Sequence, residues 1–425
     1  MQSSTPTIPQ NWTRRFFTIW TGQAFSLFGS ALVQFALIWW LTQRSGSATV
    51  LAIATLVGML PQIVIGPFAG ALVDRWNRRL IMILADALIA VSTLMLVYLF
   101  ATDQVQIWHV YAILGMRSLG TAFHFPAMSA STALMVPEDQ LTRINGLNQT
   151  LLGINGLIAP PVGALLIGIL PTHNILLIDV ATAILAILPL FFFTIPQPVR
   201  DESANASKPS LFQDIREAFN YIRGWSGLVA IISMALFLNF LLVPTGALLP
   251  ILITKHFEKG ALELGLINSA EGVGIIAGGI LLSVWGGFKK KKIVTSMAGI
   301  FLLGISVMLV GVAPANLFAL AVAGLFLTGL AIPITNGPIG ALFQSLVRND
   351  MQGRVMSLVN SAATAISPLG LLIAGPLSDA LGIQIWFWAG GLICALIGIA
   401  GFFVPSIMNI ENNKEEIPTP APEPG

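Results

Sequence analysis

Long apolar stretches, separated by short polar or charged intervals, recur along the whole chain. About 20 apolar residues in a helix span the hydrocarbon core of a bilayer, so each stretch predicts a membrane-spanning helix. We predict twelve, at residues 16–41, 48–73, 80–101, 107–128, 144–170, 174–195, 228–253, 262–285, 293–312, 317–346, 355–380 and 383–404. The chain is therefore predicted to be an all-α integral membrane protein.

The composition agrees with this prediction. Apolar residues make up 55% of the 425 residues and charged residues only 9%, whereas about a quarter of the residues in soluble domains are charged. An outer surface so poor in charge must face lipid. The net charge of +2 does not indicate nucleic-acid binding, and a single cysteine, Cys394, rules out an internal disulfide framework.

Lys and Arg collect in alternate polar intervals. Seventeen of the 21 basic residues lie on one side of the predicted helices, against Arg44, Lys255 and Lys259 on the other, while Arg117 lies within a helix. Cytoplasmic loops carry the excess of positive charge. We therefore expect both termini to be cytoplasmic.

The chain is predicted to have four regions. We expect a six-helix bundle at 1–195, a cytoplasmic linker at 196–227, a second six-helix bundle at 228–405 and a disordered, Pro-rich cytoplasmic tail at 406–425. In the linker, apolar residues at helical spacing predict a short amphipathic helix, which lies along the membrane face or packs on the bundle. These residues are Leu211, Phe212, Ile215, Ala218, Phe219 and Ile222.

The two halves look like copies offset by 211 or 212 residues. The matching pairs are Arg78 and Lys290, Arg79 and Lys291, Pro126 and Pro338, and Arg143 and Arg354. Each proline is expected to bend or end its helix. Two pseudo-symmetric bundles of this kind place a transport substrate at their interface, near the middle of the membrane.

The loop after the second predicted helix carries a motif. Residues 70–83 read GALVDRWNRRLIMI and resemble the signature loop of the major facilitator superfamily. The matching residues are Gly70, Leu72, Asp74, Arg75, Arg78 and Arg79. Asn77 replaces the usual glycine, and asparagine tolerates left-handed backbone. The resemblance implies a conformational gate in which Asp74 pairs with an arginine or a helix N-terminus; plain inner-side positive charge is the alternative.

Two further segments resemble motifs of the same superfamily. The segment MRSLGTAFHFPA places Arg117 inside a helix, and NGLIAPPVGALL resembles a degenerate exporter motif at Pro160 and Gly163. The chain to about Val404 resembles the macrolide-efflux branch of bacterial twelve-helix drug:proton antiporters. This implies the major facilitator fold and export of an amphipathic, macrolide-type compound across the inner membrane by proton antiport with alternating access. A lipid or siderophore transporter on the same fold is the alternative.

Ionisable residues inside a membrane are costly and are therefore functional candidates. Glu271, Arg117, Asp86 and Asp179 lie within predicted helices and are our candidates for proton coupling. Glu271 suits the role best, with Arg117 as its candidate partner. The alternative for Arg117 is a structural ion pair with Asp86 on the adjacent helix.

Amide and aromatic side chains on the helices expected to face the interior are the candidates for the substrate cavity. They are Gln23, Gln34, Asn155, Phe237, Asn239 and Asn336. Each could instead join two helices through a hydrogen bond. The sequence contains no catalytic constellation, metal-ligand cluster or nucleotide-binding Gly-x-x-x-x-Gly-Lys loop. We therefore expect a monomeric transporter rather than an enzyme, with no cofactor, whose partners are protons, membrane lipid and the substrate.

Overall fold

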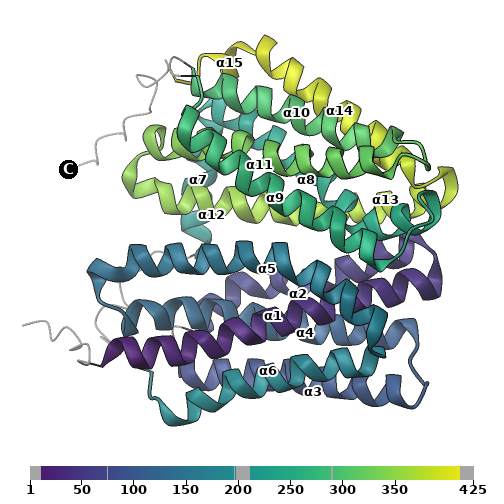
Figure 1. Cartoon of the computed structure of the whole chain (residues 1–425). Coiled ribbons are helices and arrows are strands. Elements are labelled where there is room, and N and C mark those ends of the chain that lie inside the picture. The colour runs from purple at the N-terminus through teal and green to yellow at the C-terminus, as the bar shows by residue number, and fades with distance from the viewer. Residues whose placement is uncertain (1–10, 74, 196, 198–210, 289–290, 412–425) are drawn as a thin grey trace, which may run out of the picture. The chain divides into compact units, whose positions relative to one another are not determined.

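The computed structural model describes residues 11–73, 75–195, 197, 211–288 and 291–411, and these residues form helices and turns without a strand. Residues 11–195 contain α1 (Trp12–Ser45), α2 (Ala48–Val73), α3 (Arg78–Ala101), α4 (Ile107–Met135), a 3-10 turn (Glu138–Gln140), α5 (Leu141–Ile169) and α6 (Thr172–Phe192). The described residues from 211 onward contain α7 (Leu211–Arg223), α8 (Ser226–Ile251), a π-helical turn (Leu252–His256), α9 (Ala261–Trp285), α10 (Lys292–Val312), α11 (Phe318–Leu346), α12 (Asn349–Ala365), α13 (Ser367–Leu381), α14 (Gln384–Phe403) and α15 (Pro405–Met408). Figure 1 labels these helices.

The described helices supply the predicted membrane spans. Eleven helical segments are long and apolar enough to cross a bilayer, with α12 and α13 together forming one span at Met351–Leu381. The twelfth long helix, α4, has 29 residues but includes an arginine and two histidines, which lower its hydropathy. The twelve-helix prediction is confirmed once α4 is counted with the eleven.

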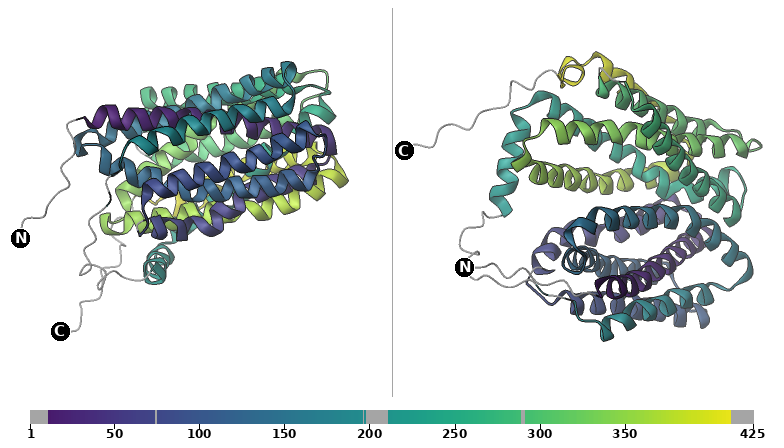
Figure 2. Two further views of the ribbon diagram at one scale, coloured as in Figure 1. Left: turned by 90° about the horizontal axis from the view of Figure 1, so that it is seen from below. Right: turned by 60° about the vertical axis from the view of Figure 1, so that its left-hand side comes forward.

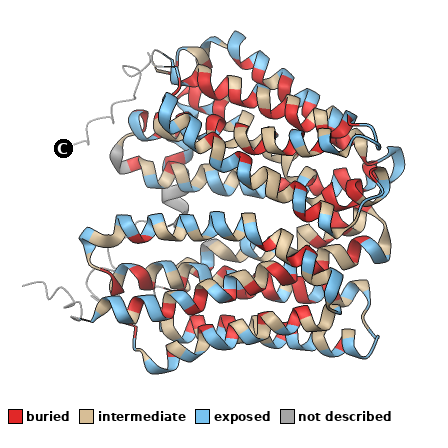
Figure 3. Cartoon of the chain, in the orientation of Figure 1, coloured by how far each residue is buried: buried red, intermediate tan, exposed pale blue. Residues whose placement is uncertain are grey.

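Large apolar side chains also lie on the outside of the bundles. Phe192, Val284 and Phe403 are each at least 79% exposed, and blue exposed positions run along the outer helix faces (Figure 3). Such side chains would be unfavourable in water but match a hydrocarbon environment. The chain is a multi-pass membrane protein.

Two predicted helix boundaries are wrong. The predicted end at residue 128 is too early, because α4 continues through Pro126 to Met135; a proline removes one backbone hydrogen bond, and the helix resumes beyond it. The predicted helix 355–380 is instead two helices, since α12 ends at Ala365 and α13 begins at Ser367. Pro368 lacks a backbone N–H and cannot donate to the carbonyl of Thr364, so a break is favoured here, and the proline is accommodated in the first turn of α13.

Backbone contacts divide the chain into two compact units: Met1–Asp201 with Ile253–Ser269, and Glu202–Leu252 with Ala270–Gly425. In the first unit, α1 packs along α6 and α5, α3 lies against both α4 and α6, and α2 packs on α4 (Figure 2). In the second unit, α10 packs against α11 and α14, and α8 packs against α13.

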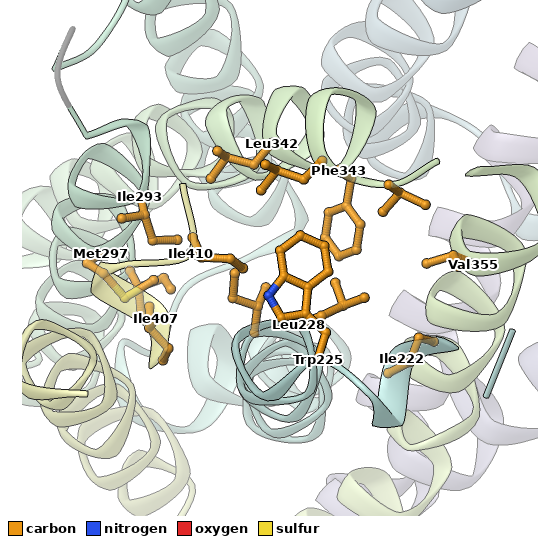
Figure 4. Close-up of a cluster of buried hydrophobic side chains, with 14 of the residues drawn as sticks. Ile222, Trp225, Leu228, Ile293, Met297, Leu342, Phe343, Val355, Ile407 and Ile410 are labelled. Atoms are coloured by element: carbon orange, nitrogen blue, oxygen red, sulfur yellow. The ribbon is translucent and has the colours of Figure 1, made fainter. Parts of the chain in front are cut away.

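The linker helix α7 packs on the second unit. Ala218 and Ile222 are buried in a hydrophobic cluster that includes Trp225 and, from the C-terminal end, Ile407 and Ile410 (Figure 4). Arg354 of α12 forms an ion pair with Glu217 of α7 at 2.6 Å. These contacts favour the packed alternative for this helix over one that only lies along the membrane face.

Glycines allow α10 and α14 to touch at their backbones. A side chain at Gly391 would collide with the main-chain nitrogen of Met308 and lie 2.7 Å from the carbonyl oxygen of Gly304. The reciprocal contact involves Gly304, whose added carbon would meet the backbone of Ala395. Close backbone approach at small residues is a common way for membrane helices to associate.

We expect Gly391→Ala to destabilise the protein by about 1–3 kcal/mol, because the added methyl group meets rigid backbone. Gly390→Ala is the matched control, since nothing lies within 4 Å of an added carbon at the neighbouring position. It should leave stability unchanged or raise it by up to about 1 kcal/mol through helix propensity. Thermal unfolding of the detergent-solubilised variants measures both effects. Equal melting temperatures would contradict the backbone contact.

Candidate functional site

A buried ion pair lies at the centre of the first unit. Asp179 of α6 is fully buried, and one of its carboxylate oxygens accepts hydrogen bonds from Arg117 of α4 and, at 3.0 Å, from Thr93 of α3. Its other oxygen accepts a 2.8 Å hydrogen bond from the hydroxyl of Ser30 in α1. Arg117 also donates to Thr93. Four helices therefore supply the groups of one closed polar network.

Local packing explains how α1 reaches this network. A side chain at Gly29 would lie 3.2 Å from the Cα of Asp179 and would collide with the hydroxyl of Thr182. Only glycine fits at this crossing of α1 and α6. The close approach brings Ser30, the next residue, within hydrogen-bonding distance of the carboxylate.

The network compensates a charge that burial would otherwise make very costly. A buried carboxylate is tolerated when it has a cationic partner and donors for its remaining lone pairs. Arg117 supplies the positive charge, and the hydroxyls of Thr93 and Ser30 supply two further donors. This arrangement indicates a fixed pair that holds α1, α3, α4 and α6 together.

A second polar cluster lies on the same helices. Asp86 of α3 is buried and accepts a 3.0 Å hydrogen bond from the amide of Gln23 in α1. The Nε2 atom of His124 in α4 lies 3.4 Å from the other oxygen of Asp86, without the geometry of a hydrogen bond. This carboxylate thus has a neutral donor and a titratable neighbour, whereas Asp179 has a permanent cation.

The sequence alternative in which Arg117 pairs with Asp86 is wrong. The helices α3 and α4 are antiparallel, and Thr93 meets Arg117 while Asp86 meets His124. Thr93 lies seven residues after Asp86 in α3, and His124 lies seven residues after Arg117 in α4, so the two contacts are about 10 Å apart along the helices. Arg117 is therefore too far along the helices to pair with Asp86.

Glu271 lies in the second unit, in α9. It is half-buried, and its carbonyl oxygen lies where a side chain at Gly329 of α11 would collide. Within the described residues, no hydrogen bond or ion pair reaches its carboxylate. Of the four candidates for proton coupling, Glu271 has the fewest compensating contacts.

The structure describes the signature loop at residues 70–79 except for Asp74. Asp74 lies outside the described residues, Gly70 lies near the end of α2, and Arg75 is exposed. Arg78 donates to the carbonyl oxygen of Ala130 in α4, and Arg79 donates to that of Phe191 in α6, both at 2.9 Å. These two arginines tie the start of α3 to the ends of two neighbouring helices.

Asn77 does not adopt the left-handed backbone that asparagine tolerates. Its φ angle is −68°, in the extended region, and its side-chain oxygen accepts a hydrogen bond from the backbone of Leu80. Asn77 acts as the N-cap of α3, a role in which asparagine is strongly preferred.

The predicted cavity residues are divided between the two units, with Gln23, Gln34 and Asn155 in the first and Phe237, Asn239 and Asn336 in the second. Gln23 is buried against Asp86, Gln34 and Asn336 are exposed, and Asn239 donates to Ala235 of its own helix at 2.9 Å. Phe237 is exposed and stacks on Phe240, with ring centroids 5.9 Å apart. The buried side-chain oxygen of Asn155 has no hydrogen-bond partner within the described part of the chain.

The exporter-like motif lies within an unbroken α5. This helix runs from Leu141 to Ile169 through Pro160. An added carbon at Gly163 would lie 3.0 Å from the ring of Phe35 in α1. Gly163 thus allows α1 and α5 to pack closely. Within the described residues, no group of three or more His, Cys, Asp or Glu side chains could hold a metal ion.

Sequence reasoning missed His124, Thr93 and Ser30 as members of the polar clusters. A usable signal existed for the first two, because α3 and α4 form an antiparallel pair joined by a short loop. In such a pair, Asp86 faces His124 when Thr93 faces Arg117. Ser30 depends on the crossing of α1 and α6, for which the sequence carries no comparable signal.

Comparison with known proteins adds relatives over most of the chain. Macrolide efflux protein A of Streptococcus pyogenes is 34% identical over 401 residues, covering 94% of this chain and 98% of that protein. Multidrug efflux pump Tap of Mycolicibacterium fortuitum is 26% identical over 404 residues, covering 90% and 94% of the two chains.

Solved structures agree at the level of the fold. A POT family transporter in complex with a thioalcohol-conjugated peptide has a TM-score of 0.73 at 13% identity, covering 95% of this chain and 100% of that chain. A bacterial homologue of the human lysosomal transporter Spinster has a TM-score of 0.71 at 13% identity, covering 97% and 100%. The family model described as Major Facilitator Superfamily matches residues 19–364 and 229–423. The chain belongs to the Major Facilitator Superfamily.

Proposed function

We propose that the protein exports an amphipathic, macrolide-type compound across the cytoplasmic membrane in exchange for protons. The observation that carries the substrate class is the 34% identity to Macrolide efflux protein A over 94% of the chain. The similarity to Multidrug efflux pump Tap also covers most of the chain and supports export of a drug-like compound.

In this proposal the two halves, residues 1–195 and 228–405, alternate in opening to the two sides of the membrane. Both termini and the linker at 196–227 face the cytoplasm, as the distribution of Lys and Arg suggests. The gate motif at Gly70, Asp74, Arg75, Arg78 and Arg79 acts on the cytoplasmic side. The protein works as a monomer.

The different surroundings of Asp179 and Glu271 suggest different roles for their carboxylates. Asp179 has a permanent cation and two hydroxyl donors, so it remains a structural ion pair throughout the cycle. Glu271 has no such compensation within the described residues. A carboxylate that is charged when water reaches it and protonated when shielded can exchange protons between two conformations. We assign the proton to Glu271, with Asp86 as the second candidate.

Expression in a bacterial strain that lacks its own efflux pumps should lower the accumulation of a radiolabelled macrolide relative to the empty vector. A protonophore should remove the difference, because it collapses the proton gradient that drives export. Unchanged accumulation across a panel of amphipathic drugs would contradict drug export. A difference that survives the protonophore would contradict proton coupling alone.

Glu271→Gln should abolish drug transport driven by a pH gradient in membrane vesicles, since glutamine cannot exchange a proton. Binding of the drug to the purified protein should remain within about a factor of two to three, because the shape of the side chain is retained. Glu263→Gln in the same helix is the matched control, as a glutamine oxygen can still accept the hydrogen bond from Gly260. Wild-type rates for Glu271→Gln would remove this residue from the proton pathway.

Asp179→Asn should destabilise the protein by about 3–5 kcal/mol, because Arg117 would be left as an uncompensated buried charge. The double variant Arg117→Met with Asp179→Leu should be more stable than Asp179→Asn, since neither charge remains. Thermal unfolding in detergent compares the three proteins. If the single variant is as stable as the wild type, the pair does not hold the helices together.

A further inference from the structure

An open groove lies along one side of the first unit, between α1 and α6. It has a volume of about 540 Å³. The groove is lined by Arg14, Phe17, Thr18, Thr21, Phe25 and Leu185. Figure 1 shows the two helices running side by side. None of the lining residues takes part in the buried polar network.

Backbone contact forms the floor of the groove. An added carbon at Gly22 would lie 2.6 Å from the carbonyl oxygen of Leu185 and 3.1 Å from the Cα of Ala186. The two helices therefore meet at this point without intervening side chains. The lining side chains come from α1, except for Leu185 of α6.

The two ends of the groove differ in chemistry. Arg14 at one end is exposed and has no hydrogen bond or ion pair from its guanidinium within the described residues, whereas the adjacent Arg15 donates to Thr194. The other end is apolar, with Phe25 53% exposed. Among the described residues, the groove thus offers the guanidinium of Arg14 at one end, followed by an open surface of Phe17, Phe25 and Leu185 with the hydroxyls of Thr18 and Thr21.

We propose that this groove binds one anionic phospholipid, with its phosphate on Arg14 and an acyl chain along Phe17, Thr21 and Phe25. The distance from Arg14 to Phe25 is eleven residues, or about 16 Å along a helix. That length is close to the roughly 15 Å depth of one leaflet's hydrocarbon. Guanidinium groups bind phosphate with paired hydrogen bonds, and basic sites between membrane helices select acidic headgroups.

Charge separates this occupant from the alternatives. A phosphatidylcholine carries a quaternary ammonium that offsets its phosphate, so Arg14 gains less from it. A macrolide carries a basic amine and would be repelled. The site does not depend on the proposed transport function, because it needs only the described geometry and a membrane.

The test is native mass spectrometry of the purified full-length protein with added phosphatidylglycerol or phosphatidylcholine. The wild type should bind one phosphatidylglycerol in preference to phosphatidylcholine. Arg14→Gln should weaken the first lipid about fivefold, the effect of one basic residue near an anionic headgroup. Thr21→Phe should also weaken it by filling the groove without changing the charge. Arg143→Gln, an exposed arginine in the first turn of α5, is the matched control and should bind like the wild type.

Equal binding of the two lipids by the wild type would overturn the proposal, as would an equal loss in Arg143→Gln and Arg14→Gln. Unchanged phosphatidylglycerol binding by both groove variants would place the lipid elsewhere. Displacement of phosphatidylglycerol by a macrolide, with loss of macrolide binding in Thr21→Phe, would make the groove a drug site instead. A protein that transports no drug still gives each of these outcomes.

Discussion

The buried charge of Asp179 is the constraint on which the first unit depends. No exposed surface remains on this residue, so its carboxylate must find all its partners inside the protein. Arg117, Thr93 and Ser30 come from three other helices. Sliding any one of these helices by a turn would leave a donor or the carboxylate unsatisfied. The pair therefore specifies the register of four helices, which apolar packing alone does more weakly.

The second polar layer follows from the first. Once Thr93 of α3 lies beside Arg117 of α4, the antiparallel arrangement places Asp86 beside His124, seven residues away on both helices. An added carbon at Gly120 would lie 3.1 Å from the carbonyl oxygen of Ala85, so glycine keeps the two backbones close between the layers. The fixed ion pair and the less compensated Asp86 are thus two consequences of one helix alignment.

The sequence predicted the spans well because hydropathy is a local property, and α4 was recognisable although its charged and polar residues lower its average. It also identified Asp86, Asp179 and Arg117 as costly residues, since a charge inside an apolar stretch is visible without a structure. Their partners were harder to predict. The pairing of Arg117 with Asp179 requires α6 to lie beside α3 and α4, a tertiary contact that local pattern does not contain. The cap at Asn77 and the break after Ala365 depend on local geometry that motif resemblance and hydropathy did not reveal.

The contrast between the carboxylates bears on how a transporter of this family can couple protons to movement. The carboxylate of Asp179, bonded to a permanent cation and two hydroxyls, stabilises one arrangement of helices. Glu271 projects from α9 where this helix touches α11 at Gly329, and the described residues provide no cation for it. In the proposed cycle, its charge is met by water when the site is open and is removed by a proton when the site is shielded. Under the proposed proton exchange, a fixed charge and an exchangeable charge need different surroundings, which Asp179 has in the first unit and Glu271 has in the second.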